Sequence, residues 1–404
     1  MLTYKFYDQR LDKYKELYRN SLLNDVIPFW LEHAQDEEFG GITTCVDREG
    51  KRYSSDKSVW MQGRTAWTFS RLCNQYGAKP EWLKLAKSCV DFLNNYCFDP
   101  KDGRMYFSVT REGAPIRKRR YIYSECFYIM GNAEYARASG DRKALENARR
   151  LFDSTFAIYA DPSADPFKPE PKFMPQTRPM RAFGYSMILL NVTSVLRIAD
   201  PERAKLYDES AKQLIDDIFH YFIRPELHAV LESVGTDGSF LEDCSIGRVV
   251  NGGHDLEGVW FLADEAMHFG DEALLKKLPD VYDWAYNFGW DKKYGGFYNF
   301  VDVKGFPPEQ YEHDMKMWWG ANEAVIAALK MFRLLGDERY LKDFEMLTDY
   351  AFRTYADPKN GEWFGYLRRD NLPTEPACKG GIYKGPFHVP RMMLEVDSML
   401  SRRD

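Results

Sequence analysis

The chain has 404 residues, of which 45% are hydrophobic and 16% aromatic, and its formal net charge is −6 at pH 7. The acidic balance argues against nucleic acid or an anionic membrane as a partner, and no apolar run approaches the ~20 residues that cross a bilayer. The first residues lack the apolar core of a signal peptide, and the 7 cysteines have no zinc-ligand spacing, so we expect a cytoplasmic protein with reduced cysteines.

Helix pairs recur along the chain, and a Gly-Asp stop divides each pair. Glycine just past the last apolar residue ends a helix, and the aspartate that follows can cap the next one. The three clearest pairs are 127–138 with 143–156, 259–269 with 272–288, and 322–335 with 338–355.

The two helices of a pair differ in character. First helices, such as the segment 323–329, are apolar on nearly every side, whereas second helices, such as 341–347, carry charges on one face. A helix that is apolar all round is buried, and an amphipathic helix covers it. We therefore predict an inner ring of helices wrapped by an outer ring.

Turn signals follow the outer helices. Asp-to-Gly segments at 36–41, 99–103, 291–296 and 357–361 each lead into an aromatic-rich alternating run, which is typical of short strands or hairpins. The repeat is about 60 residues long, so about six helix pairs fit. The sequence predicts an all-α (α/α)6 toroid, formed by residues 1–404 as a single domain, with short β-hairpins on the active-site end.

Two histidine segments indicate chemistry. His254 lies in NGGHDLE (251–257) and His388 in GPFHVPR (385–391), each in a turn-like setting with a charged residue three positions on. A structural role would be the simpler interpretation of one such histidine, but the chain has only 7. Histidine gives and takes protons near neutral pH. A pair that faces one pocket can remove a proton from one face of a substrate and return it on the other, which is epimerase or isomerase chemistry.

A carboxylate accompanies the first of these histidines. On a helix, His254 and Glu257 are i,i+3 neighbours on one face, and a carboxylate beside an imidazole raises its pKa and fixes its orientation. The two also resemble half of a metal site, but the HExxH spacing is absent. We expect no metal.

Two further charged residues lie in apolar surroundings. Arg64 lies between Trp60 and Trp67, and Glu323 opens an apolar helix one turn after Trp319. A charge in such a place needs a partner, so Arg64 either forms a structural salt bridge or stabilises an oxyanion. Glu323 either caps its helix or belongs to the pocket.

Four motifs together resemble a known family. WMQGR (60–64), NGGHDLE (251–257), WWGANEA (318–324) and GPFHVPR (385–391) occur in the order seen in the N-acylglucosamine 2-epimerase (renin-binding protein) family. The resemblance spans roughly residues 20–395, and FHVPR is its most specific part, because the related cellobiose 2-epimerases differ there. Gly252 and Pro386 depart from the family pattern, and neither is a proton-transfer residue.

The resemblance implies an (α/α)6 barrel that reversibly converts N-acetyl-D-glucosamine to N-acetyl-D-mannosamine. It assigns proton transfer to His254 and His388, and a polar pocket to Arg64, Glu257 and Glu323. It implies no cofactor for the chemistry, although some members are stimulated by ATP or another nucleotide. The expected partner is a small-molecule sugar, and the expected assembly is a homodimer.

The expected mechanism requires an open-chain sugar, since only the free aldehyde acidifies the C2 hydrogen. His388 serves one face of C2 and His254 the other, in an order that the sequence leaves open. Arg64 would stabilise the enediolate oxygens, while Glu257 and Glu323 would orient the histidines and bind hydroxyl groups. The residues expected to contact the sugar are Trp60, Trp67, Trp319 and Arg391.

Three alternatives remain at this stage. One is another sugar 2-epimerase or an aldose–ketose isomerase of the same fold, of the mannose or cellobiose type. A second is a glycoside hydrolase or lyase, which would need two facing carboxylates. The third is a non-catalytic binding protein, which the renin-binding name of the family suggests.

Overall fold

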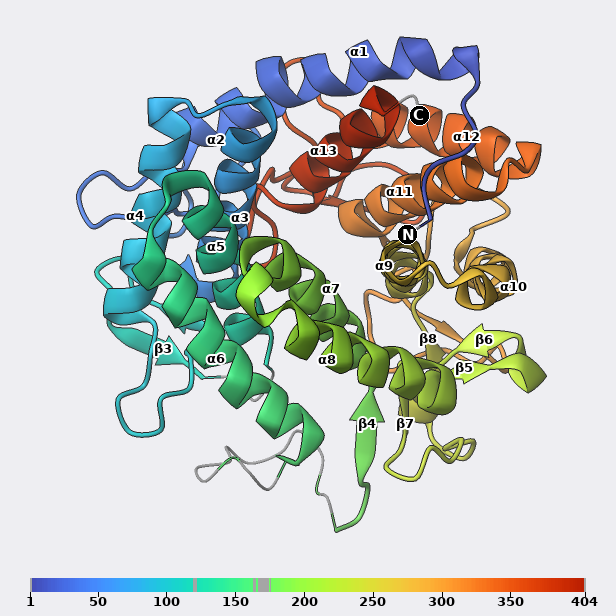
Figure 1. The fold of residues 1–404 in the computed structure, drawn as a ribbon. Coiled ribbons are helices and arrows are strands. Elements are labelled where there is room, and N and C mark those ends of the chain that lie inside the picture. The colour runs from blue at the N-terminus through green and yellow to red at the C-terminus, as the bar shows by residue number, and fades with distance from the viewer. Residues whose placement is uncertain (1, 119–121, 163–164, 166–173, 175, 403–404) are drawn as a thin grey trace.

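The computed structural model describes residues 2–118, 122–162, 165, 174 and 176–402 of the chain. Within them, six helices form a closed inner ring, because each packs against the next and the last packs against the first; the ring can be followed in Figure 1. The inner helices are α3 (Val59–Tyr76), α5 (Tyr123–Ser139), α7 (Phe183–Ala199), α9 (Gly252–Phe269), α11 (Trp318–Leu335) and α13 (His388–Ser401).

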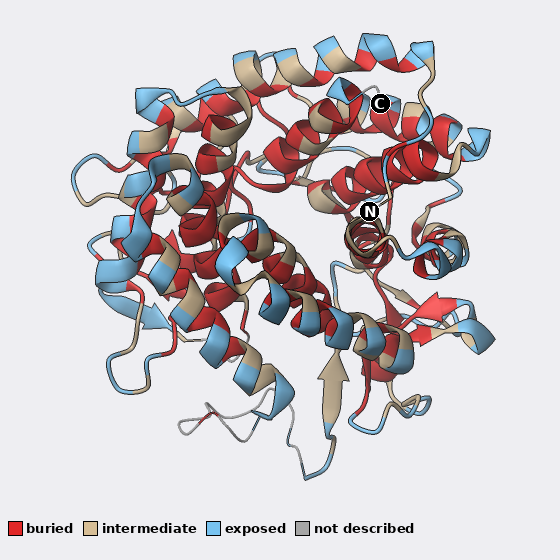
Figure 2. Ribbon diagram, viewed as in Figure 1, coloured by how far each residue is buried: buried red, intermediate tan, exposed pale blue. Residues whose placement is uncertain are grey.

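Outer helices cover this ring. Of those that the structure describes, the five from α4 to α12 each pack against the inner helix that precedes them in the chain, whereas α1 covers α13 and so brings the two ends of the chain together. The outer helices are exposed on their outward faces, whereas the inner helices are mostly buried (Figure 2). They are α1 (Asp12–Ser21), which a π-helical segment (η2, Leu22–Val26) joins to α2 (Ile27–His33), then α4 (Pro80–Tyr96), α6 (Arg142–Ala160), α8 (Ala204–Asp217), α10 (Glu272–Gly289) and α12 (Glu338–Tyr355). The predicted (α/α)6 fold is confirmed.

The Gly-Asp stops act as predicted. The glycine after each of α5, α9 and α11 adopts a left-handed backbone conformation, and the aspartate that follows accepts backbone N–H groups in the first turn of α6, α10 or α12. The residues are Gly140 with Asp141, Gly270 with Asp271, and Gly336 with Asp337.

Short strands lead into most of the inner helices. β1 (Lys57–Ser58) precedes α3, β4 (Met180–Ala182) precedes α7, β8 (Val249–Val250) precedes α9, and β10 (Lys316–Met317) precedes α11. Their antiparallel partners are β2 (Ser108–Val109), which also pairs with β3 (Pro115–Arg117), and β7 (Ser233–Gly235), β9 (Val301–Asp302) and β11 (Tyr366–Leu367); β5 (Ile223–Arg224) pairs with β6 (Ala229–Val230). The strands therefore lie at the end of the barrel where the inner helices begin.

Short helical turns complete the described elements. The 3-10 helices are η1 (Gln9–Leu11), η4 (Pro201–Arg203), η6 (Pro225–Leu227) and η7 (Ser245–Arg248), and η5 (Ile218–Phe222) is a π-helical extension of α8. Among the described residues, no helix combines the length and the apolar character that a bilayer crossing demands.

The four predicted Asp turns are present, but each closes only a single bridge rather than a hairpin ladder. A buried lysine binds the aspartate of three of them, so that the turn is fixed to another part of the strand end. The pairs are Asp36 with Lys57 at 2.9 Å, Asp291 with Lys316 at 3.0 Å, and Asp357 with Lys379 at 3.1 Å. An arginine adds to each pair: Arg111, Arg369 and Arg48, respectively.

Candidate active site

The residues that the sequence selects come together where the inner helices begin. Two inner helices, α9 and α11, approach closely there at Gly253. A Cβ atom added to Gly253 would lie 2.7 Å from the Trp319 ring and 2.9 Å from Gly320. The first two turns of four helices supply the site: Trp60 and Arg64 from α3, His254 and Glu257 from α9, Trp319 and Glu323 from α11, and His388 and Arg391 from α13.

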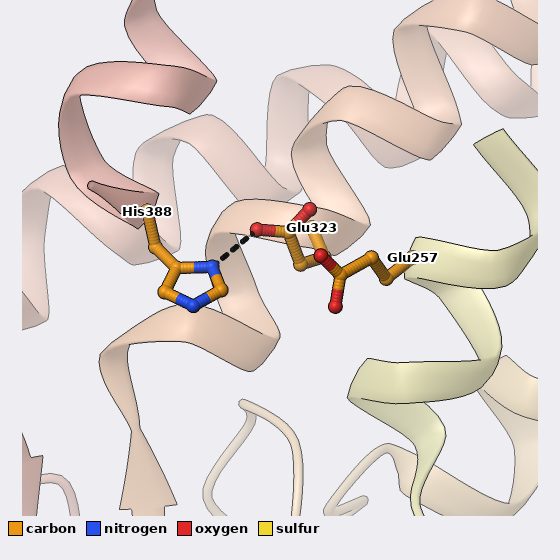
Figure 3. A group of neighbouring side chains, drawn as sticks. All are labelled: Glu257, Glu323 and His388. Atoms are coloured by element: carbon orange, nitrogen blue, oxygen red, sulfur yellow. Dashed lines mark hydrogen bonds and ion pairs between the residues drawn. The ribbon is translucent and has the colours of Figure 1, made fainter. Parts of the chain in front are cut away.

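His388 and Glu323 form a buried dyad, drawn in Figure 3. His388 Nδ1 lies 2.8 Å from Glu323 Oε1, and Trp260 Nε1 donates to the other carboxylate oxygen at 2.9 Å. An ionised carboxylate accepts a proton from Nδ1, so the ring presents Nε2 as its basic nitrogen. The role of Glu323 in orienting a histidine is therefore supported by geometry, and it does not act as a helix cap.

Arg391 lies between the two buried glutamates. Its Nη2 atom bonds to Glu257 Oε1, lies 2.7 Å from Glu323 Oε1, and is 3.3 Å from His388 Nδ1. The side chain is 1% exposed. We expected Arg391 to contact the sugar, but its position is that of a buried cation that neutralises two carboxylates.

The same three acidic and imidazole groups also resemble a metal site. One ligand atom each from Glu257, Glu323 and His388 lies within 4.8 Å of the others. The guanidinium of Arg391 contacts all three side chains, so the positive charge that a metal ion would bring to this place is already supplied. We interpret the group as an ion network.

His254 forms the second dyad with Glu232, a residue that no sequence motif identified. Its Nδ1 atom lies 2.8 Å from Glu232 Oε1, and its ring packs against Trp319 at a centroid distance of 4.9 Å. The expected partner, Glu257, is instead bound to Arg391. Glu257 therefore does not fix the orientation of His254, because a fully charged guanidinium is a stronger partner for a buried carboxylate than an imidazole is, but its charge does raise the pKa of His254 as expected.

The surroundings drive the two imidazoles toward opposite protonation states. Burial lowers the pKa of His254, but the nearby carboxylates, led by the charge and hydrogen bond of Glu232 and followed by the charges of Glu257 and Glu323, outweigh burial and raise it above its usual value. Burial and the charges of Arg64 and Arg391 hold the pKa of His388 well below its usual value. These surroundings therefore favour the neutral, proton-accepting form of His388 and the protonated, proton-donating form of His254.

Arg64 is a half-buried cation with few partners. Its guanidinium lies over the rings of Phe127 at 4.1 Å and Phe387 at 4.9 Å, and Nη1 donates to the Tyr383 carbonyl at 3.4 Å. Nε has no hydrogen-bond partner. Burial and the charge of Arg391 lower the pKa of Arg64 to about 9, which leaves it charged at neutral pH. Among the described residues Arg64 forms no salt bridge, so the geometry favours an oxyanion as its partner over a structural role.

The three tryptophans occupy different positions. Trp319 contacts both histidine rings, at centroid distances of 4.9 Å and 6.1 Å. Trp60 is half-buried, and its Nε1 donates to Ser124 Oγ at 3.0 Å. Trp67 is 5% exposed and packs on Phe387 at 5.3 Å, so it supports the residue before His388 from within the core. Trp319 and Trp60 are thus better placed than Trp67 to meet a substrate.

Comparison with known proteins identifies relatives along almost the whole chain. The family model described as N-acylglucosamine 2-epimerase (GlcNAc 2-epimerase) matches residues 40–384. The N-acylglucosamine 2-epimerase of Bos taurus is 37% identical over 383 residues, which cover 94% of this chain and 89% of the relative. The Homo sapiens protein of the same name is 36% identical over 382 residues, covering 94% of this chain and 88% of the relative.

A solved structure confirms the architecture. The cellobiose 2-epimerase from Spirochaeta thermophila DSM 6192 superposes with a TM-score of 0.83 at 22% sequence identity, and the match covers 97% of this chain and 98% of that chain. At this identity, the similarity concerns the fold.

Proposed function

The chain belongs to the N-acylglucosamine 2-epimerase family, and on that premise we propose that it is an isomerase that interconverts N-acetyl-D-glucosamine and N-acetyl-D-mannosamine. One observation carries the mechanism: His254 and His388 each bind a carboxylate through Nδ1. Their Nε2 atoms have no protein hydrogen bond among the described residues. Two such bases, whose surroundings favour opposite protonation states, suit removal of a proton at one face of C2 and its return at the other.

The first half-reaction begins with the open-chain sugar, whose C1 aldehyde acidifies the C2 hydrogen. Nε2 of His388 accepts the C2 proton, the C2–H electron pair forms a C1=C2 double bond, and the carbonyl pair moves onto O1. The resulting enolate carries its charge beside a guanidinium, in our assignment that of Arg64. Its buried Nε and its position over two aromatic rings support that assignment.

The second half-reaction restores the aldehyde. The O1 electron pair re-forms the carbonyl, the double-bond pair takes a proton from Nε2 of His254 on the opposite face, and C2 is inverted. The enzyme then holds a protonated His388 and a neutral His254, which is the starting state for the reverse reaction. Proton exchange with solvent resets the pair.

The test is conversion in D₂O followed by NMR. Incubation with N-acetyl-D-glucosamine should give N-acetyl-D-mannosamine with deuterium at C2, because the entering proton comes from an exchangeable histidine. No conversion would contradict the proposed substrate. Conversion without deuterium would contradict the two-base mechanism and indicate hydride transfer or a shielded single base.

The alternative within the isomerases is a related sugar 2-epimerase or an aldose–ketose isomerase, since the same two bases can act on any open-chain aldose. Parallel incubations with mannose, cellobiose and fructose distinguish these substrates. A glycoside hydrolase is disfavoured, because Glu257 and Glu323 both bind Arg391 and do not form a free acid and base on either side of a glycosidic bond.

The cellular setting is a further part of the proposal. All 7 cysteines are free thiols, which suits the reducing cytoplasm. We expect a homodimer, no cofactor for the chemistry, and stimulation by ATP or a similar nucleotide, on the strength of the family resemblance alone. Light scattering at several concentrations tests the dimer, and initial rates with and without ATP test the stimulation.

A further inference from the structure

Glu232 lies in the short link between β6 and β7, far from any recognisable motif. Its backbone N–H donates to the carbonyl of Val249 at 2.9 Å, just before α9, and its carbonyl accepts from the N–H of Phe183, the first residue of α7, at 3.0 Å. The main chain of Glu232 therefore ties the beginnings of two inner helices together. These bonds do not involve its side chain, which reaches His254.

The carboxylate of Glu232 forms an ion pair with His254. Among the described residues, no lysine or arginine forms a salt bridge with Glu232, and the only ion pair that it makes is with His254. The dyad of His388 differs, because its carboxylate on Glu323 is shared with Arg391. A carboxylate that is not neutralised by a neighbour favours the protonated form of the imidazole it binds.

Other groups around His254 do not replace Glu232. Asp255 is buried, and burial, followed by the charge of Glu232, raises its pKa well above the usual value, which favours the neutral form of this carboxyl group. Glu257 on α9 and Glu323 on α11 also raise the pKa of His254, but both of these carboxylates bind the guanidinium of Arg391. The ring of His388, on α13, is also coupled electrostatically to His254.

We propose that Glu232 is the positioning residue of His254: it accepts the Nδ1 proton of the ring, turns Nε2 toward the substrate, and keeps on that nitrogen the proton that is delivered to C2. The inference rests on the proposed function for its catalytic consequence. Its structural content concerns the protonation of His254 and can be tested separately. The two glutamates of the dyads then have distinct tasks, because Glu323 orients a neutral base and Glu232 maintains an acid.

The decisive variant is Glu232→Gln. The amide can still accept the Nδ1 proton, so the tautomer survives while the charge is lost. We expect kcat for N-acetyl-D-glucosamine to fall about tenfold or more, with KM changing far less. The alkaline limb of the kcat/KM profile should move to lower pH by about one unit or more, since loss of a nearby carboxylate lowers the pKa of an imidazole. Glu232→Asp should recover part of both effects.

The protonation of His254 can also be read without turnover. NMR of side-chain-labelled histidine reports each ring, and the 7 histidines make the His254 signal assignable by its loss in His254→Asn. The His254 signal of Glu232→Gln should titrate about one unit or more lower than in wild type. The matched control is Asp208→Asn, which removes the carboxylate 2.9 Å from another histidine, His268: it should leave the titration of His254 and the activity unchanged.

The outcomes separate the two proposals. An unchanged His254 titration in Glu232→Gln overturns the role of Glu232, whatever the enzyme acts on. A lowered titration together with a shifted alkaline limb supports it. If the wild-type protein converts none of the sugars tested, the proposed function is wrong. The NMR titration still decides, in that case, whether Glu232 sets the protonation of His254.

Discussion

The guanidinium of Arg391 lies 2.7 Å from the carboxylate of Glu323, at the one place among the described residues where three acidic and imidazole groups come close enough to hold a metal ion. A buried carboxylate pair needs a positive charge, and either a metal or an arginine can supply it. The chain places the arginine there. The polar pocket is thus electrically balanced by side chains of the protein itself.

Removal of metal ions should therefore leave the wild-type enzyme active. Initial rates of N-acetyl-D-glucosamine conversion before and after dialysis against EDTA should agree within error, with the metal content measured by mass spectrometry. An activity that disappears on dialysis and returns with Zn²⁺ or Mn²⁺ would make Glu257, Glu323 and His388 ligands of a catalytic metal.

Arg391→Ala should convert the ion network into a metal site. The variant keeps two carboxylates and an imidazole within 4.8 Å but loses their cation, which should lower the free energy of unfolding by about 3–5 kcal/mol. Zn²⁺, which binds such ligands, should raise the thermal midpoint of the variant and not that of wild type. Arg391→Lys retains a charge at this place and serves as the control. If Arg391→Ala is as stable as wild type and indifferent to zinc, the network does not depend on this cation.

His254→Asn and His388→Asn should fail in different ways. Asparagine keeps some hydrogen bonding but cannot carry a proton, so each change should reduce net epimerisation by at least ~10² while the fold survives. With one base left, each variant should still exchange the C2 proton of one epimer with D₂O, and the sensitive epimer should differ between the two variants. NMR of both sugars measures the exchange. Net epimerisation above about a hundredth of the wild-type rate in both variants would contradict the two-base mechanism.

How much of this site can be predicted from the sequence depends on how close in the chain the contacting residues are. The ring of helix pairs follows from patterns within each repeat, and His254 and His388 lie in recognisable segments. Glu232 is 22 residues from His254 in the chain, and no periodicity connects them, so their contact comes from the way β7 and β8 lie beside α7 and α9. Glu257 was expected to pair with His254, because helical spacing predicts neighbours on one face of a helix. Such spacing cannot predict that a buried arginine from another helix, Arg391, is the partner instead.

The prediction of helix boundaries from the sequence is limited in a similar way. The apolar run predicts that α9 begins at 259, and the structure begins it at Gly252. The first two turns carry polar and small residues that serve the site, so they do not match the pattern of a buried helix. The lysine that binds each Asp turn was also unpredicted: Lys57 and Asp36 have no common motif, and only the folded barrel brings them together.

Arg64→Lys should lose much of the activity although the charge remains. The planar guanidinium of Arg64 lies 4.1 Å from the Phe127 ring centre and can bind two oxygens at once, whereas an ammonium group is a point charge. We expect kcat to fall about 10²-fold. Arg71→Lys is the matched control on the same helix, because Arg71 pairs with Glu395 at 3.7 Å away from the site. Near-normal turnover in Arg64→Lys would make Arg64 a structural residue.

The Asp turns predict how the fold responds to acid. Burial raises the pKa of Asp291, but the Lys293 N–H and the Lys316 and Arg369 side chains outweigh it and hold that pKa far below its usual value. A carboxyl group with a lowered folded-state pKa stabilises the fold above its unfolded-state pKa of about 3.9. That contribution is lost as the pH falls from there through the folded-state value.

Asp291→Asn should therefore destabilise the protein at neutral pH and matter less in acid. Burial lowers the pKa of Lys316 to about 8, so Lys316 is charged at pH 7 and would be left buried without its carboxylate, at a cost of about 3 kcal/mol. Urea midpoints should differ between wild type and variant by a constant amount from pH 7 to about pH 5, and should converge below about pH 4. Asp349→Asn, which removes an exposed partner of Arg353, should leave the midpoint unchanged. A difference between wild type and Asp291→Asn that persists undiminished into strong acid would show that the turn is held by packing and not by its ion pair.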